Sequence, residues 1–137
     1  MTDRTGGCLC GAVRYTAHDA PDTFGACHCT MCQHISGGVN MAFTAKADRF
    51  EISGTEAVRA YRSSDWAERS FCGTCGSNLW YRLVTPSDTP HDYHVGFGTL
   101  DDKSGMLFGY EICVDTQPAA YAFAGERVRK TSAEVLG

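Results

Sequence analysis

Cysteine is the residue type whose number and spacing stand out in this chain of 137 residues. Seven of its eight cysteines fall into three clusters, and Cys113 stands alone. The first ten residues, MTDRTGGCLC, contain no apolar segment of the kind found in secretory signals, so we expect a cytoplasmic protein. In that reducing compartment, clustered thiols bind metal more often than they form disulfides.

Two of the clusters predict a structural zinc site. In FCGTCG, two residues separate Cys72 from Cys75 and a glycine follows each, which is typical of a turn that points both sulfurs at one ion. In CLCG, an extended strand would project Cys8 and Cys10 from the same face, and a modest twist or bulge would bring their sulfurs together. We therefore predict a closed site of four thiolates: Cys8, Cys10, Cys72 and Cys75.

The third cluster, CHCTMC, predicts a different kind of zinc site. One short turn can place Cys27, Cys29 and Cys32 around a metal, and three protein ligands with an open fourth position are typical of catalytic zinc. Cys113, His28 or His34 could instead close the site and make it structural. The apolar run LFGYEICV also suits Cys113 as a small buried hydrophobic residue.

Length and composition limit the class of protein. A hydrophobic fraction of 43% and a charged fraction of 20% are ordinary for one globular domain, which we expect to span residues 1–137. No run approaches the ~18 apolar residues of a membrane helix. A net charge of -4 argues against a protein held on nucleic acid by phosphate contacts.

The residue pattern predicts a mainly β fold. Short alternating or β-branched stretches separated by turn residues predict strands at 12–17, 39–44, 50–53, 57–62, 68–71, 78–83, 93–97, 107–114 and 120–124. A single helical turn is expected at 31–36, a turn at 101–105 and a frayed tail from Gly125 onward. An exposed strand edge would allow a homodimer.

The order of the motifs resembles the glutathione-dependent formaldehyde-activating enzyme family. The motifs are GGCLCGAVRY, CHCTMCQHISG, RSFCGTCGSNLW, VGFGTLDD and EICVDTQPAAY, and they cover about residues 6–121. The resemblance implies a Mss4-like β-tent of short antiparallel sheets stapled by zinc. It also implies two zinc ions per chain, one structural on Cys8, Cys10, Cys72 and Cys75, and one labile and catalytic on Cys27, Cys29 and Cys32. The implied activity is that of a carbon–sulfur lyase that joins glutathione to formaldehyde.

Three positions depart from the family pattern. Gln33 stands where the family commonly has arginine, and Glu111 and Tyr121 replace a histidine and a tryptophan in the last motif. An anion at position 111 and the lack of a cation at position 33 would both disfavour an acidic thiol if they faced the pocket. The thiol and carbonyl substrates therefore stay open.

Three thiolates suit thiol chemistry better than water activation. Zinc with three thiolates carries a charge of -1 and is a weak Lewis acid, but it can hold a substrate thiol as a nucleophilic thiolate. We expect that thiolate to add reversibly to a small aldehyde. For the proton, the sequence offers His28, His34, Tyr15 and Tyr93.

Other polar residues near the motifs have plainer interpretations beside functional ones. Ser36-Gly37-Gly38 could offer backbone N–H groups to an anion, but a plain turn is the favoured interpretation. Asp101 and Asp102 are also assigned to a turn. Arg69 could offset the charge of the four-thiolate site or be a solvated strand residue.

Two other classes of function compete with the enzyme. The first is a non-catalytic binding module stapled by zinc, which needs only the four-thiolate site. The second is a thiol or metal sensor, in which loss of the labile zinc lets two of Cys27, Cys29 and Cys32 form a disulfide.

Overall fold

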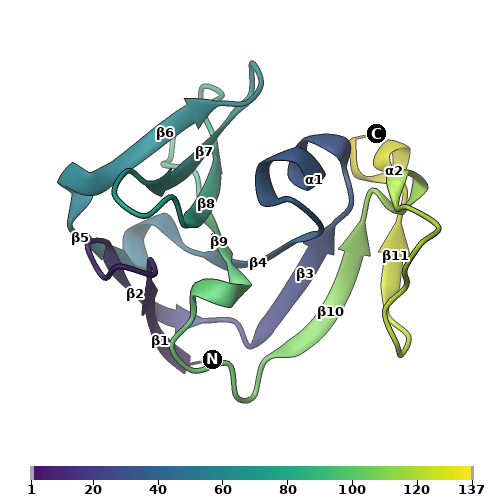
Figure 1. The fold of residues 1–137 in the computed structure, drawn as a ribbon, viewed down its shortest axis with the longest axis horizontal. Helices are drawn as coiled ribbons and strands as arrows, with labels where there is room; N and C mark the ends of the chain where they lie inside the picture. Colours follow the sequence, from purple (N-terminus) through teal and green to yellow (C-terminus); the bar gives the residue numbers. More distant parts are fainter. Residues whose placement is uncertain (1, 137) are drawn as a thin grey trace.

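The computed structural model describes residues 2–136, which are mainly β (Figure 1). The strands are β1 (Thr2–Gly7), β2 (Arg14–Ala20), β3 (Thr23–Cys27), β4 (Asn40–Ala45), β5 (Phe50–Ser53), β6 (Val58–Arg62), β7 (Ala67–Cys72), β8 (Asn78–Leu83), β9 (Tyr93–Gly96), β10 (Leu107–Ile112) and β11 (Val128–Lys130). The α-helices are α1 (Thr30–Ser36) and α2 (Ser132–Leu136). Single 3-10 turns lie at Ala47–Arg49, Thr55–Ala57, Phe97–Thr99 and Val114–Thr116. The prediction of a mainly β fold is confirmed.

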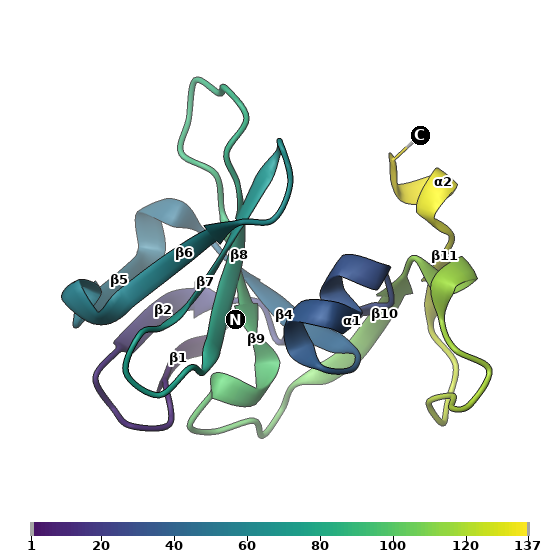
Figure 2. The ribbon, with the colours of Figure 1, turned by 45° about the horizontal axis from the view of Figure 1, so that its top comes forward.

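The strands form one small and one large sheet. The small sheet has the order β1-β2-β5, and the large one has the order β11-β10-β3-β4-β9-β8-β7-β6. The large sheet curves, so that β6, β7 and β8 stand on one side of α1 and β10 and β11 on the other (Figures 1 and 2). The expectation of antiparallel sheets needs one correction, because β10 runs parallel to both β3 and β11.

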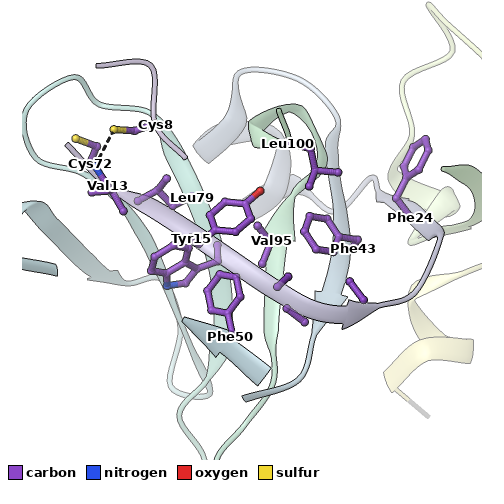
Figure 3. Close-up of a cluster of buried hydrophobic side chains, with 14 residues drawn as sticks. Cys8, Val13, Tyr15, Phe24, Phe43, Phe50, Cys72, Leu79, Val95 and Leu100 are labelled. Carbon is purple, nitrogen blue, oxygen red and sulfur yellow. Dashed lines mark hydrogen bonds between the residues drawn. The ribbon is translucent and has the colours of Figure 1, made fainter. Parts of the chain in front are cut away.

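The hydrophobic core lies between the small sheet and the middle of the large one. Tyr15 of β2 and Phe50 of β5 pack with rings 5.1 Å apart, and Phe50 meets Trp80 of β8 edge to face. Figure 3 shows Tyr15 and Phe50 with Phe43 and Val95, and places Cys8 and Cys72 at one end of the same cluster. The core thus fixes both cysteine-bearing turns relative to the sheets.

Eight of the predicted strands correspond to observed ones, with ends that differ by up to three residues. The predictions for β5 and β8 match their observed bounds. The strand predicted at 120–124 is wrong, since these residues form no strand. Strand β3 escaped prediction because it is buried on both faces between β10 and β4, so its sequence does not alternate. Strand β1 escaped because its sequence, TDRTGG, is polar.

The prediction of a frayed tail from Gly125 differs from the structure. Strand β11 pairs with β10, and α2 follows it. Arg127 anchors the segment: its Nη1 donates to Oε2 of Glu111 at 2.7 Å, and its guanidinium lies 4.0 Å from the ring centroid of Phe108. Both members of this ion pair are buried, so the tail is held by contacts that a composition argument does not reveal.

Within residues 2–136, the structure contains no helix long and apolar enough to cross a membrane. The edges of the large sheet are β6 and β11, and most residues of both are exposed. The possible homodimer stays a prediction.

Candidate metal centres and active-site cavity

Cys8, Cys10, Cys72 and Cys75 come together as the sequence predicts. Their sulfurs all lie within 4.8 Å of one another, a spacing at which the group could hold a metal ion. The Sγ atoms of Cys8 and Cys10 are 3.6 Å apart, and those of Cys10 and Cys72 are 3.8 Å apart. Cys8 and Cys10 lie in the β1–β2 connection, whereas Cys72 ends β7 and Cys75 lies in the turn before β8. An ion here would therefore join the two sheets.

Backbone N–H groups in the turns donate hydrogen bonds to sulfurs of this group, which stabilises thiolates. The N–H of Val13 donates to Sγ of Cys8 at 3.3 Å, and the N–H of Thr74 donates to Sγ of Cys72 at 3.4 Å. Gly11 and Gly76 adopt φ of 81° and 79°, which a residue with a side chain rarely adopts. The expected strand geometry for Cys8 and Cys10 is wrong, because both lie in a turn after β1. The turn achieves the same convergence.

Cys27, Cys29 and Cys32 form the second group, also with all sulfurs within 4.8 Å. Cys27 ends β3, and Cys29 is the N-cap of α1. The Sγ of Cys29 accepts a hydrogen bond from the N–H of Cys32 at 3.3 Å. This single helical turn brings the third sulfur back toward the other two. Among the described residues no fourth histidine, cysteine or carboxylate joins this group.

Arg69 serves the second group and not the first. Its Nη1 and Nη2 lie 3.4 Å and 3.5 Å from Sγ of Cys32, and its Nε donates to Oγ of Ser63. The side chain is buried, and its guanidinium lies 4.9 Å from the ring centroid of Tyr81. The predicted role at the four-cysteine site is therefore wrong, and so is the alternative of a solvated strand residue. A buried cation beside Cys32 stabilises negative charge on that sulfur.

The thiols of the second group cannot all ionise by themselves. Hydrogen bonds from Cys27 and Cys32 lower the pKa of Cys29 far below its usual value. The hydrogen bond with Cys29, aided by burial, raises the pKa of Cys27. One thiolate thus forms at the cost of its neighbours, and only a further positive charge would let all three lose their protons.

A cavity of about 390 Å³ opens beside the second group. All three of its cysteines line the cavity, together with Arg69, Tyr81 and His94 from β7, β8 and β9. Burial lowers the pKa of His94, so its ring is neutral at pH 7. His94 and Tyr81 were missed by sequence reasoning. The alternation of Tyr93, His94 and Val95 could have revealed His94, because the first and third pack in the core and the second must face away.

His28 lies between two cysteines in the sequence, but its side chain is fully buried and contacts Glu111 and Tyr121. Its Nε2 lies 2.8 Å from Oε1 of Glu111, and its Nδ1 lies 3.5 Å from the hydroxyl of Tyr121. Burial by itself raises the pKa of Glu111. Hydrogen bonds from Arg127 and His28 outweigh this effect, so the net result is a lowered pKa. Glu111 therefore does not line the cavity as an unpaired anion; its charge is balanced inside the fold.

Gln33 is also occupied elsewhere. Its amide Nε2 donates to the carbonyl oxygens of His28 at 2.7 Å and Thr116 at 3.0 Å. These bonds tie α1 to the segment after β10, and Gln33 does not line the cavity. Two of the departures from the family pattern thus form internal contacts, and the third, Tyr121, touches His28.

The remaining candidates separate clearly. Cys113 is buried and lines the cavity, but its sulfur lies outside the three-cysteine group. His34 is exposed, Tyr15 bonds Thr99 in the core, and Tyr93 packs under Arg82, so none of them lines the cavity. Ser36 is the last residue of α1 and Gly37 follows it in a turn, in agreement with the favoured interpretation of Ser36-Gly37-Gly38 as a plain turn. Asp101 pairs with Arg14 and Thr5, which lower its pKa to about 2, in agreement with a structural turn.

Replacing Arg69 by glutamine should weaken metal binding at the three-cysteine group by about 10–100-fold, because partners that orient and charge-balance metal ligands contribute that much to affinity. Competition with a chromophoric chelator measures this directly. Arg82→Gln is the matched control, since Arg82 lies on the next strand, stacks on Tyr93 and touches neither cysteine group. Equal loss of metal from both variants would contradict the assignment of Arg69.

Comparison with known proteins places the chain in a family. Residues 3–115 match the family described as glutathione-dependent formaldehyde-activating enzyme. An uncharacterized lyase of Schizosaccharomyces pombe is 30% identical over 136 residues, which cover 99% of this chain and 96% of the relative. A protein of Halomonas elongata, provisionally named a glutathione-dependent formaldehyde-activating enzyme, is 34% identical over 83 residues, which are 55% of this chain and 53% of that protein.

A crystal structure of a Rhodobacter sphaeroides protein superposes with a TM-score of 0.54 at 26% identity, covering 71% of this chain and 87% of the other. Fold, cysteine spacing and sequence similarity therefore lead to one conclusion. The chain belongs to the glutathione-dependent formaldehyde-activating enzyme family.

Proposed function

We propose that this protein is a zinc-dependent carbon–sulfur lyase that adds a thiol to a small aldehyde and catalyses the reverse reaction. In its family's name the thiol is glutathione and the aldehyde formaldehyde, and the product of that pair is S-hydroxymethylglutathione. The observation that carries the proposal is the three-cysteine group, which opens onto a cavity and has no fourth protein ligand among the described residues.

Zinc fits the donor sets of both groups. Sulfur ligands of cysteine are preferred by this ion, four for a structural site and three for a site with an open position. The N–H groups of Val13 and Thr74 that face Cys8 and Cys72, and Arg69 beside Cys32, would each compensate negative charge on the sulfurs. We assign Cys8, Cys10, Cys72 and Cys75 to a structural zinc, and Cys27, Cys29 and Cys32 to a labile catalytic one.

Bound in this site, zinc would hold the substrate thiol as a thiolate at neutral pH. A thiolate attacks the carbonyl carbon, a C–S bond forms, and the electron pair of the C=O bond moves to oxygen, which takes up a proton. The cavity would hold the aldehyde beside the nucleophile. In the reverse direction the hydroxyl loses its proton and the C–S bond breaks.

His94 is the group we assign to proton transfer. Its neutral ring can accept the proton that the thiol loses and return it to the oxygen of the adduct. Its Nδ1 lies 3.4 Å from Oγ1 of Thr44, and its ring meets that of Tyr81 at 5.7 Å, so its orientation is restrained.

The enzyme explains the structure better than the two competing functions. A binding module needs only the four-cysteine group and has no use for three further thiols at the mouth of a cavity. A sensor based on a disulfide does not require the buried Arg69, which favours thiolates as ligands. All eight cysteines are unpaired as thiols, which suits the predicted cytoplasmic location.

Cys29→Ser should abolish catalysis while the protein stays folded and keeps one zinc per chain. Exchange NMR with isotope-labelled formaldehyde and a thiol measures the interconversion of aldehyde and adduct. Cys72→Ser is the contrasting variant: it should unfold the domain, because structural zinc contributes folding free energy. A Cys29→Ser protein with undiminished exchange rate would contradict the proposed function.

His94→Gln should slow the same exchange by about 100-fold without loss of zinc, the usual contribution of a positioned acid–base group. The wild-type rate should also fall at acidic pH, and the fall should lie below the ordinary histidine range because burial lowers the pKa of His94; the variant should lack this fall. His91→Gln is the control, since His91 lies in the loop near Thr85, away from the cavity. A His94→Gln protein with the wild-type pH profile would refute the assignment.

A further inference from the structure

The walls of the active-site cavity have an unusual composition. Eight large hydrophobic side chains of the described residues are exposed, and four of them line this one cavity: Met31, Trp66, Leu83 and Val135. They come from α1, the β6–β7 connection, β8 and α2, so four separate segments present apolar surface to the same space. Tyr110 and Ile112 of β10 complete this wall. Apolar patches that converge on a concave site mark ligand binding.

The cavity offers little to an anionic substrate. Among the residues that the structure describes, Arg69 is the one permanently charged side chain that lines it. Its guanidinium is already bonded to Cys32 and Ser63 and is buried. Three thiolates, one zinc ion and this guanidinium sum to a neutral centre, which leaves no spare positive charge.

Glutathione does not match these walls. It carries two carboxylates, and burying a carboxylate without a partner is strongly unfavourable. Position 33, where the family commonly has arginine, holds a glutamine whose amide is bonded to two backbone carbonyls outside the cavity. The volume of about 390 Å³ lies at the small end of the range for small-molecule sites.

We propose that the physiological thiol is uncharged and bears an apolar organic group, an inference that rests on the proposed function. This group packs between Trp66, Leu83 and Val135 while the sulfur of the thiol faces the three cysteines. The apolar wall thus determines specificity, and the thiolate centre supplies the chemistry.

The test compares two thiols with one skeleton, benzyl mercaptan and 4-(mercaptomethyl)benzoate, on the zinc-loaded protein. Trp66 lies in the cavity wall, so its fluorescence reports occupancy, and Trp66→Phe shows how much signal comes from the buried Trp80. Benzyl mercaptan should bind at least about tenfold more tightly than its carboxylate counterpart and than glutathione, a ratio that corresponds to 1.4 kcal/mol.

A pair of valine substitutions tests the wall itself. Val135→Lys places a cation at the cavity and should shift the preference toward the carboxylate thiol. Val128→Lys is the control, because Val128 is also an exposed valine but lies on β11 outside the cavity, and the preference should not change. Equal or tighter binding of glutathione by the wild-type protein would overturn the inference and leave the lyase intact. If no thiol binds at all, the proposed function fails together with it.

Discussion

Mutual repulsion among closely packed sulfurs is the constraint on which the site depends. In each group the sulfurs lie within 4.8 Å, and three or four thiolates at that distance are stable only beside compensating positive charge. The fold supplies part of it: backbone N–H groups at Cys8 and Cys72, and the buried guanidinium of Arg69 at Cys32. A divalent cation would supply the rest, and it would also fasten the small sheet to the large one.

The mixed pairing of the large sheet positions the three-cysteine group. Because β3 and β10 run parallel, their carboxyl ends lie side by side, and Cys27 pairs in register with Ile112. The chain leaves both strands at that edge, turning into α1 on one side and into the segment that begins at Cys113 on the other. The buried contacts of Glu111 with His28 and Arg127 hold this edge and the tail together, so α2 can form a wall of the cavity.

Cysteine spacing was sufficient to predict both groups, since CxxC and CHCTMC restrict their sulfurs to one turn each. The strand pattern predicted most of the sheets as well. Outside the cysteines, contacts between distant segments were not accessible: nothing in the residues near Arg69 indicates that it reaches Cys32, thirty-seven positions earlier. For the same reason Glu111 was interpreted as a possible pocket anion, although Arg127, sixteen residues later, neutralises it in the core.

The cavity itself depended wholly on tertiary structure. Met31, Trp66, Leu83 and Val135 are unremarkable in sequence and become a wall only when four segments converge. His94 could have been recovered from strand alternation, but its relation to the cysteines could not. Chemistry that belongs to a local motif is therefore visible in the sequence, whereas the surface that selects a substrate is not.

The proposed function requires that one metal site is closed by four cysteines and that the other, with three, keeps a position for a thiol. Cadmium NMR of the metal-substituted protein tests it most directly, because each site gives its own resonance and the chemical shift reports the number of sulfur ligands. We expect two resonances. One should be typical of four thiolates and unaffected by added thiol, and the other should be typical of three and move to the four-sulfur range when thiol is added. A single resonance, or a second one that is already typical of four sulfurs without added thiol, would contradict it.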